Sequence, residues 1–198
     1  MHQTIRPFAV LAVLTLGALP ARAGDSPWFA RAKFGQADVD AAFGEPVFGR
    51  RVDDEDGTAA VELGYRFGPH LAIQAGYHDL GEYEGLELPC PLAQPCPDLD
   101  EIPFRLSTVE LTGVSLSLVP RLPLGERFSL FGTIGVIDWN ADIVADTGGD
   151  TIDSFDGQDL LAGVGLGYDL PSGLGFQLEL EGFELDAVAL TAGVGWRF

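Results

Sequence analysis

Charged side chains stand two residues apart in segments whose other positions are largely apolar. Arg31 and Lys33 form one such pair, and Glu179 and Glu181 form another. In an extended chain, side chains two residues apart point to the same face, and charges shielded from water are costly unless they are paired. We therefore predict an internal network of ion pairs. The predicted members are Arg31, Lys33, Glu62, Arg66, Glu179 and Glu181.

Two cysteines lie in a proline-rich stretch, and we expect them to form a structural disulfide. Cys90 and Cys96 are the two cysteines of the chain, and such a pair is normally oxidised in an exported protein. No other soft metal ligand lies near them in the sequence, and their spacing is not the Cys-x-x-Cys of redox sites. The small ring would contribute about 2 kcal/mol to the free energy of unfolding, and less because neighbouring prolines already restrict the unfolded chain.

Two further groups of residues suggest chemistry more weakly. His78 has no serine near it in the sequence, although a serine on a neighbouring strand would supply the partner that a nucleophilic pair requires. A run of acidic residues with a spacing of three, which includes Gly157, does not match the calcium-binding pattern D-x-[DN]-x-[DN]-G. We predict no enzymatic activity, no metal ion and no cofactor. The acidic run consists of Asp150, Asp153, Asp156 and Asp159.

Eight segments carry the alternation of apolar and polar residues that is typical of strands. The connections between them are short at one set of ends, as at 68–70, and long at the other, as at 80–107. Short turns on one rim and long loops on the other are typical of a transmembrane barrel. We therefore predict an all-β, eight-stranded antiparallel up-and-down barrel with short periplasmic turns and three longer extracellular loops. The predicted strands are Trp28–Asp38, Thr58–Phe67, Leu71–Asp79, Thr108–Val119, Phe128–Asp138, Asp159–Leu170, Leu174–Phe183 and Ala187–Phe198.

The two ends of the sequence predict export and insertion into a membrane. Arg6 precedes an apolar run that leads to Ala21-Arg22-Ala23, which is the pattern of a cleaved secretory signal. We predict a signal peptide at 1–23 and one barrel domain at 24–198. The last segment alternates up to Trp196 and Phe198, which would place aromatic side chains at a bilayer interface. A soluble β-sandwich also has alternating strands, but it does not explain the unequal rims.

The chain is strongly acidic, and its acidic residues are concentrated in the predicted long loops. The formal charge is −19, and loss of Arg6 and Arg22 with the signal leaves nine basic against 30 acidic residues, a charge of −21. Of those 30 acidic residues, 21 lie within 38–56, 79–101 and 138–159. Such a surface excludes nucleic acid as a partner. Solvation of exposed loops explains the pattern, with binding of divalent cations or of a cationic ligand as alternatives.

Several stretches of the chain resemble the OmpA-type eight-stranded outer-membrane barrels, in the branch without a periplasmic domain. The resemblance covers essentially the whole mature chain and concerns architecture. It implies that the charged set named above, Glu181 apart, is the lumenal cluster of the family. It also implies that Trp196 and Phe198 form the C-terminal signal read by the barrel-assembly machinery. The stretches are Leu71–Gly81, Gly135–Asp142, Gly163–Leu170, Glu181–Asp186 and Gly193–Phe198.

Members of that family serve as membrane anchors, as adhesion surfaces and as small ion pores. We expect a monomeric structural or surface protein of the cell outer membrane, in contact with lipid and lipopolysaccharide, with acidic loops outside and a salt-bridged lumen. An eight-stranded barrel is just wide enough to be filled by side chains, which excludes a wide, porin-like channel. Two alternatives remain: a narrow pore gated by the lumenal ion pairs, and an adhesin or ligand-binding surface formed by the loops.

Overall fold

The computed structural model describes residues 26–43, 50–86, 106–145, 151–184 and 187–198. The predicted signal peptide at 1–23 lies outside these residues, as do Cys90 and Cys96, so the signal and the disulfide remain predictions. The described segments consist almost wholly of β-strand. The strands are β1 (Trp28–Phe43), β2 (Arg50–Arg66), β3 (Leu71–Leu86), β4 (Leu106–Pro123), β5 (Phe128–Ala145), β6 (Thr151–Asp169), β7 (Leu174–Phe183) and β8 (Ala187–Arg197).

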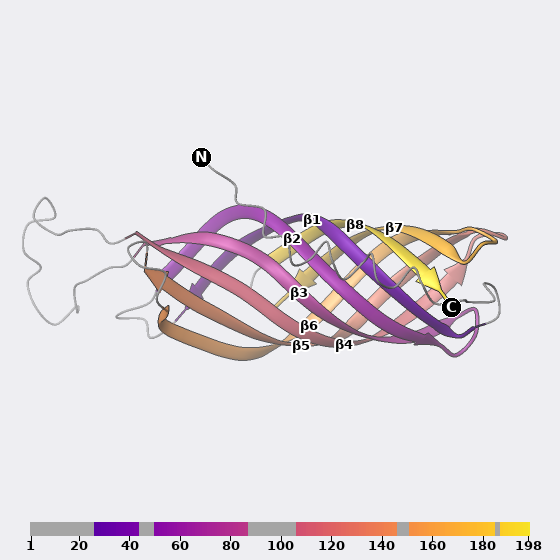
Figure 1. Cartoon of the computed structure of the whole chain (residues 1–198), viewed down its shortest axis with the longest axis horizontal. Coiled ribbons are helices and arrows are strands. Elements are labelled where there is room, and N and C mark those ends of the chain that lie inside the picture. The colour runs from indigo at the N-terminus through magenta and orange to yellow at the C-terminus, as the bar shows by residue number, and fades with distance from the viewer. Residues whose placement is uncertain (1–25, 44–49, 87–105, 146–150, 185–186) are drawn as a thin grey trace, which may run out of the picture.

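The eight strands close into one antiparallel barrel. Each strand pairs with its neighbours in sequence, and β1 also pairs with β8, from Phe29 opposite Arg197 to Val39 opposite Ala187. Figure 1 shows an elongated barrel whose strands are inclined to its long axis. The predicted up-and-down, eight-stranded barrel is therefore confirmed. No helix in the described part of the chain is long and apolar enough to cross a membrane.

Several strands run well past their predicted ends, into segments that the sequence pattern assigned to loops. β4, β5 and β6 have 18, 18 and 19 residues, whereas about 9–11 residues suffice to cross a bilayer. On β5 the acidic Asp138 and Asp142 point outward and alternate with buried Ile137, Ala141 and Ile143. Asp142, which the sequence pattern assigned to a loop, therefore lies on the outward face of a continuing strand.

An apolar belt covers the outer face of the barrel over the part that carries the short turns. On β5, for example, the outward-facing Ile134 is 64% exposed. At the rim with the short turns, the rings of Trp28 and Phe67 each pack edge-on against Tyr65, with centroids 5.1 Å apart. Aromatic side chains are enriched where a membrane protein meets the bilayer interface. Other members of the belt are Leu63, Tyr77, Val114, Leu116, Leu166, Leu178, Leu190 and Trp196.

Inside the barrel, buried side chains form two apolar layers with a charged layer between them, and a second charged network lies at the rim with the short turns. In the apolar layer next to that rim, Phe29 and Phe131 pack with Ala72 and Val119. The middle layer is polar and charged and is described below. The layer furthest from the short turns is apolar and lies inside the strand extensions, which the sequence pattern had assigned to loops. Its buried members are Ala37, Val39, Leu80, Tyr83, Val109, Leu111, Ile137, Ala141, Ile143, Leu161, Phe183, Ala187 and Ala189.

The structure also defines which side chains of β4 and β5 face the interior. Glu110 lies between the buried Val109 and Leu111, and because neighbouring side chains on a strand face opposite sides, Glu110 faces outward. Trp139 packs against the apolar interior layer and therefore faces inward. The choice follows from the apolar side chains on the inner face of both strand extensions.

Candidate functional site

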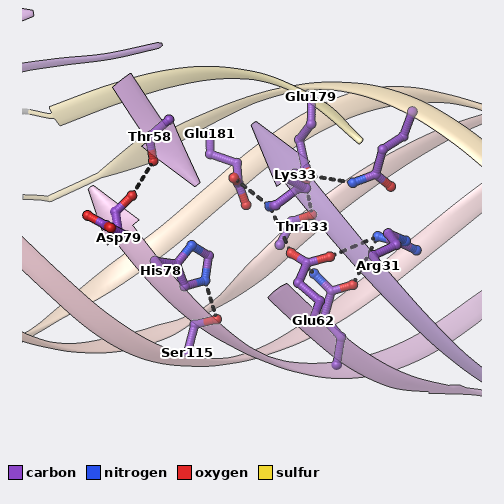
Figure 2. Close-up of polar contacts among 12 residues, drawn as sticks. Arg31, Lys33, Thr58, Glu62, His78, Asp79, Ser115, Thr133, Glu179 and Glu181 are labelled. Atoms are coloured by element: carbon purple, nitrogen blue, oxygen red, sulfur yellow. Dashed lines mark hydrogen bonds and ion pairs between the residues drawn. The ribbon is translucent and has the colours of Figure 1, made fainter. Parts of the chain in front are cut away.

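The middle layer is built around the ammonium group of Lys33 on β1, which contacts three carboxylates. Its Nζ lies 2.7 Å from Glu62 Oε1 on β2, 2.7 Å from Glu181 Oε2 on β7 and 3.3 Å from Glu179 Oε2 on β7. Figure 2 shows these side chains converging from opposite sides on Lys33. The Lys33 side chain is fully buried. The sequence prediction that these acids and bases meet inside the barrel thus matches their placement.

Lys33 can reach β7 because the strand between them carries little bulk at that level. β8 separates β1 from β7, and Gly193 of β8 is the direct partner of Lys33. A Cβ atom on Gly193 would lie 3.1 Å from Lys33 Cγ and 3.0 Å from Gln177 Cγ, which is tighter than ordinary packing. The glycine therefore leaves the space through which the lysine stem passes.

Glu62 is the second centre of the network and joins Lys33 to Arg31. Arg31 Nη1 lies 3.2 Å from Glu62 Oε2 and donates to Gln74 Oε1 at 3.3 Å. Gln74 in turn donates from Nε2 to Glu62 Oε1 at 3.2 Å. The Arg31 guanidinium also lies 4.5 Å from the centroid of the Phe29 ring, a favourable cation–π distance. Glu62 therefore contacts three donor side chains, two from β1 and one from β3.

Glu179 and Glu181 complete the charged layer from β7. Thr133 Oγ1 donates to Glu179 Oε1 at 2.5 Å, and Gln177 Nε2 donates to Glu179 Oε2 at 3.4 Å. Glu181 Oε1 has no hydrogen-bond partner. Ligand atoms of the three glutamates lie within 4.8 Å of one another, but the Lys33 ammonium already occupies the space between them. Lys33 and the three glutamates form a closed set of ion pairs. The Lys33 ammonium lies between the carboxylates, where a metal ion bound by them would lie.

Arg66, the remaining predicted member, belongs to a second network closer to the short turns. Its Nη1 lies 3.2 Å from Asp169 Oδ2 on β6. Arg121 Nη2 on β4 lies 3.5 Å from the same oxygen and donates to Ser129 Oγ at 2.7 Å. The prediction of one shared cluster is therefore wrong for Arg66, because Arg66 is the last residue of β2, four residues beyond Glu62, and lies at the rim with the short turns.

Several polar residues of the interior escaped the sequence analysis. Arg121 was assigned to a turn, although the inward-facing Ser115, Ser117 and Val119 lead to it at the period of a strand. Asp169 lies near the end of a predicted strand and was given no role. Thr133 is an uncharged polar residue in a segment rich in apolar ones and gave no signal of its own. Extending β4 by its alternation to Pro123 would have found Arg121.

His78 does have a serine partner, which lies on the neighbouring strand β4. Its Nε2 lies 2.8 Å from Ser115 Oγ on β4, and the His78 ring packs edge-on against Phe183 with centroids 6.4 Å apart. His78 and Ser115 are 2% and 4% exposed. The pair lies between the charged layer and the apolar layer, where it is enclosed by protein. Its geometry is that of a buried polar contact between neighbouring strands.

The other predicted groups lie apart from the interior networks. Trp196 faces outward and is 41% exposed, and the Phe198 N–H donates to the Trp28 carbonyl oxygen at 3.3 Å, which ties the end of β8 to β1. Asp150 lies outside the described residues. Asp153 and Asp156 are exposed on β6, and because a strand has period two, a spacing of three turns successive acids to opposite faces. In the described part of this run, the acids therefore do not converge.

A closed eight-stranded antiparallel barrel with an apolar outer belt and a polar, filled interior defines a class of membrane-spanning protein. The chain belongs to the outer membrane protein beta-barrel domain family, whose sequence model matches residues 8–198. The family and its structures point to the outer membrane of Gram-negative bacteria as the location of the protein. Among curated proteins, no sequence relative is found.

Solved structures of outer-membrane barrels share this fold at low sequence identity. Neisserial surface protein A is 14% identical, with a TM-score of 0.61 over 87% of this chain and 98% of its own. OprG from Pseudomonas aeruginosa is 12% identical, with a TM-score of 0.58 over 88% and 99%. Ail, the attachment invasion locus protein of Yersinia pestis, is 16% identical, with a TM-score of 0.50 over 86% and 99%. At such identities the likeness establishes the fold alone.

Proposed function

We propose that the protein is a monomeric structural and surface barrel of the outer membrane, whose acidic strand extensions and loops form its outward face. The observation that carries this proposal is the filled interior. The residues of the charged layer around Lys33 and those of the apolar layer in the strand extensions are buried, which supports a closed interior. The predicted cleavable signal at 1–23 and the C-terminal strand ending in Trp196 and Phe198 would bring the chain to the membrane and to the assembly machinery.

The outward face is the part of the protein that contacts other molecules under this proposal. On the strand extensions, Asp38, Asp138 and Asp156 are exposed, and the acidic residues of the predicted loops add to the same end. An anionic face of this kind would sit among lipopolysaccharide phosphates, with divalent cations screening both. A ligand-binding or adhesive role would use the same face, and Ail, one of the similar structures, carries the name of an attachment protein.

A narrow pore is the alternative that the interior argues against. Opening the barrel would require the ion pairs of Lys33 to separate and the apolar layer above them to rearrange as well. Exchange of partners within the charged layer opens nothing while Leu111, Ile137 and Phe183 remain packed. The apolar layer, which the sequence did not predict, is therefore the reason to favour a closed barrel.

Planar-bilayer recordings on the refolded protein test this proposal. We expect no conductance steps from the wild type, and none from Glu179→Ala, because the apolar layer stays closed when a lumenal ion pair is removed. Insertion is checked separately by the shift in gel migration between unboiled and boiled samples. Discrete steps from correctly folded wild type would establish a pore and overturn the proposal.

The same two proteins also test the structural role in cells. We expect a strain without the protein to be more sensitive to detergent and chelator than its parent. Glu179→Ala should restore resistance as well as the wild type does, because the role depends on the shell and its outer face. Restoration by the wild type alone would assign the function to the lumen.

A further inference from the structure

Three arginine side chains from different strands converge at the end of the barrel that carries the short turns. Arg66 of β2, Arg121 of β4 and Arg197 of β8 line one cavity of about 20 Å³. Because short turns face the periplasm in barrels of this family, the cavity lies at the periplasmic end. Its volume accommodates an atom group about the size of a water molecule, so the oxygens of a small group would fit while the rest remained at the mouth.

The charge in this cavity is not balanced by the protein. Asp169 is the one carboxylate among the residues that line it, and it is shared by Arg66 and Arg121. Arg197 makes no ion pair with any described residue. Arg31 also lines the cavity, but its charge is matched by Glu62. The lining therefore carries an excess of two positive charges in a chain whose net charge is strongly negative.

Two hydrogen-bond donors in the cavity lining are also unused. The Nε atoms of Arg66 and Arg197 are buried and have no partner in the structure. Buried donors are nearly always satisfied, and an exception indicates a bound water or ion. A ligand that satisfies these donors must offer acceptors, and the surplus of positive charge selects an acceptor that is itself negative.

Two glycines leave the space of this cavity open. Gly167 and Gly195 are among its lining residues. A Cβ atom on Gly167 would lie 2.9 Å from Ser129 Oγ and 3.3 Å from Arg121 Nη2. One on Gly195 would lie 2.6 Å from Arg31 Cγ. Side chains at these two positions would displace the arginines and fill the space.

We propose that this periplasmic cavity binds one small oxyanion, a phosphate or a carboxylate group, through the guanidinium groups of Arg66, Arg121 and Arg197. Guanidinium groups form paired, charge-assisted hydrogen bonds to such oxyanions. The anion is either free in the periplasm or the terminal headgroup of a lipid in the inner leaflet of the outer membrane. Both present the same chemistry to the site.

NMR of the arginine Nε–H groups in the refolded, ¹⁵N-labelled barrel tests the proposal. We titrate inorganic phosphate in one arm and short-chain phosphatidic acid in the other, with short-chain phosphatidylcholine as the lipid control, all in a neutral detergent. Saturable shifts of Arg66 and Arg197 with phosphate identify a free anion, and shifts with phosphatidic acid alone identify a lipid headgroup. Shifts in neither arm, or equal shifts with phosphatidylcholine, would overturn the proposal.

Two substitutions separate binding from folding. Arg197→Gln should weaken phosphate or phosphatidic acid binding about tenfold, since it removes a charged hydrogen-bond donor. Arg127 is exposed near the same rim but outside the cavity, so Arg127→Gln should change affinity less than twofold. Asp169→Asn removes the competing carboxylate and should tighten binding several-fold. If Arg197→Gln and Arg127→Gln behave alike and Asp169→Asn does not tighten binding, the site is refuted.

Discussion

The two ends of the barrel are built from the same strands with opposite polarity. In the part that carries the short turns, outward-facing side chains are apolar, and the interior holds the charged networks with one small apolar layer between them. In the strand extensions, outward-facing side chains are largely polar or acidic and the interior is apolar. On β5 the change occurs within a few residues. Thr133 faces inward and Ile134 outward in the first part, whereas Ile137 faces inward and Asp138 outward in the extension.

The inversion follows from a change of solvent along the strand. Lipid surrounds the part that carries the short turns, called the lower part below, so apolar side chains face outward there and polar ones turn inward. Water surrounds the extensions, so the hydrophobic effect puts apolar side chains inside and leaves charges outside. β4 repeats the pattern, with Ser115 and Ser117 inside the lower part and Val109 and Leu111 inside the upper part. One protein thus carries a membrane barrel and a water-exposed barrel in tandem.

The largest expected effect tests the charged interior of the lower part. Lys33→Met would leave Glu62, Glu179 and Glu181 buried with only Arg31 as a nearby cation. Removing one partner of a buried ion pair typically costs about 3–5 kcal/mol, so we expect the free energy of unfolding to fall by about that amount. Urea unfolding of the barrel in lipid vesicles, followed by the shift in gel migration, measures the change.

A matched variant distinguishes charge from packing at the same position. In the triple variant Lys33→Met, Glu62→Gln and Glu181→Gln, the uncompensated charge is largely gone, so a good part of the lost stability should return. If Lys33→Met unfolds at the same urea concentration as the wild type, the charged layer does not stabilise the barrel and the comparison between its two interiors fails.

A charge placed on the outer face locates the boundary between the two parts. Leu116 lies in the apolar belt of β4, and Thr112 lies outward on the same strand in the extension. Arginine on the lipid face costs about 2–4 kcal/mol near the midplane and about 0–1 near the interface. We therefore expect Leu116→Arg to destabilise strongly and Thr112→Arg weakly in the same vesicle assay. Equal effects would mean that the belt ends elsewhere.

The smallest expected effect concerns one methyl group on each face. Ile143 is buried in the apolar interior layer, whereas Ile134 is exposed in the belt. Ile143→Val should cost about 0.5–1.5 kcal/mol because the interior is left with a cavity. Ile134→Val should cost less, since lipid chains move into the vacated space. Both are read from urea midpoints in one series, and a larger loss for Ile134→Val would contradict a packed upper interior.

The sequence analysis was most accurate where a single periodicity covered a whole strand. β7 and β8 were predicted to within a residue of their ends. Lipid on one side and polar groups on the other give these strands the same alternation of apolar and polar residues along most of their length. β4, β5 and β6 were predicted too short because the outward side changes from apolar to polar along each strand, and acidic residues such as Asp142 and Asp156 then suggested a loop. Treating the acids as one face of a strand would have recovered the extensions.

The interior charges were predicted in part for a related reason. Alternation assigns Lys33, Glu62 and Glu179 to the inner face without any knowledge of the third dimension. Alternation does not predict the position of each side chain along the barrel axis, because that position depends on strand tilt and on the stagger between neighbouring strands. Arg66 was for this reason grouped with Lys33, although it pairs with Asp169 at the rim.

The sequence by itself determined the architecture and the inward or outward direction of most side chains, because period two in a strand is a local property. Only the tertiary structure decided which acid meets which base. Lys33 reaches Glu179 and Glu181 across β8 because Gly193 leaves room between them, and that room exists only once β1 and β8 have closed the barrel. The cluster of three arginines at the periplasmic end arises in the same way, from strands that are distant in sequence and brought together by closure.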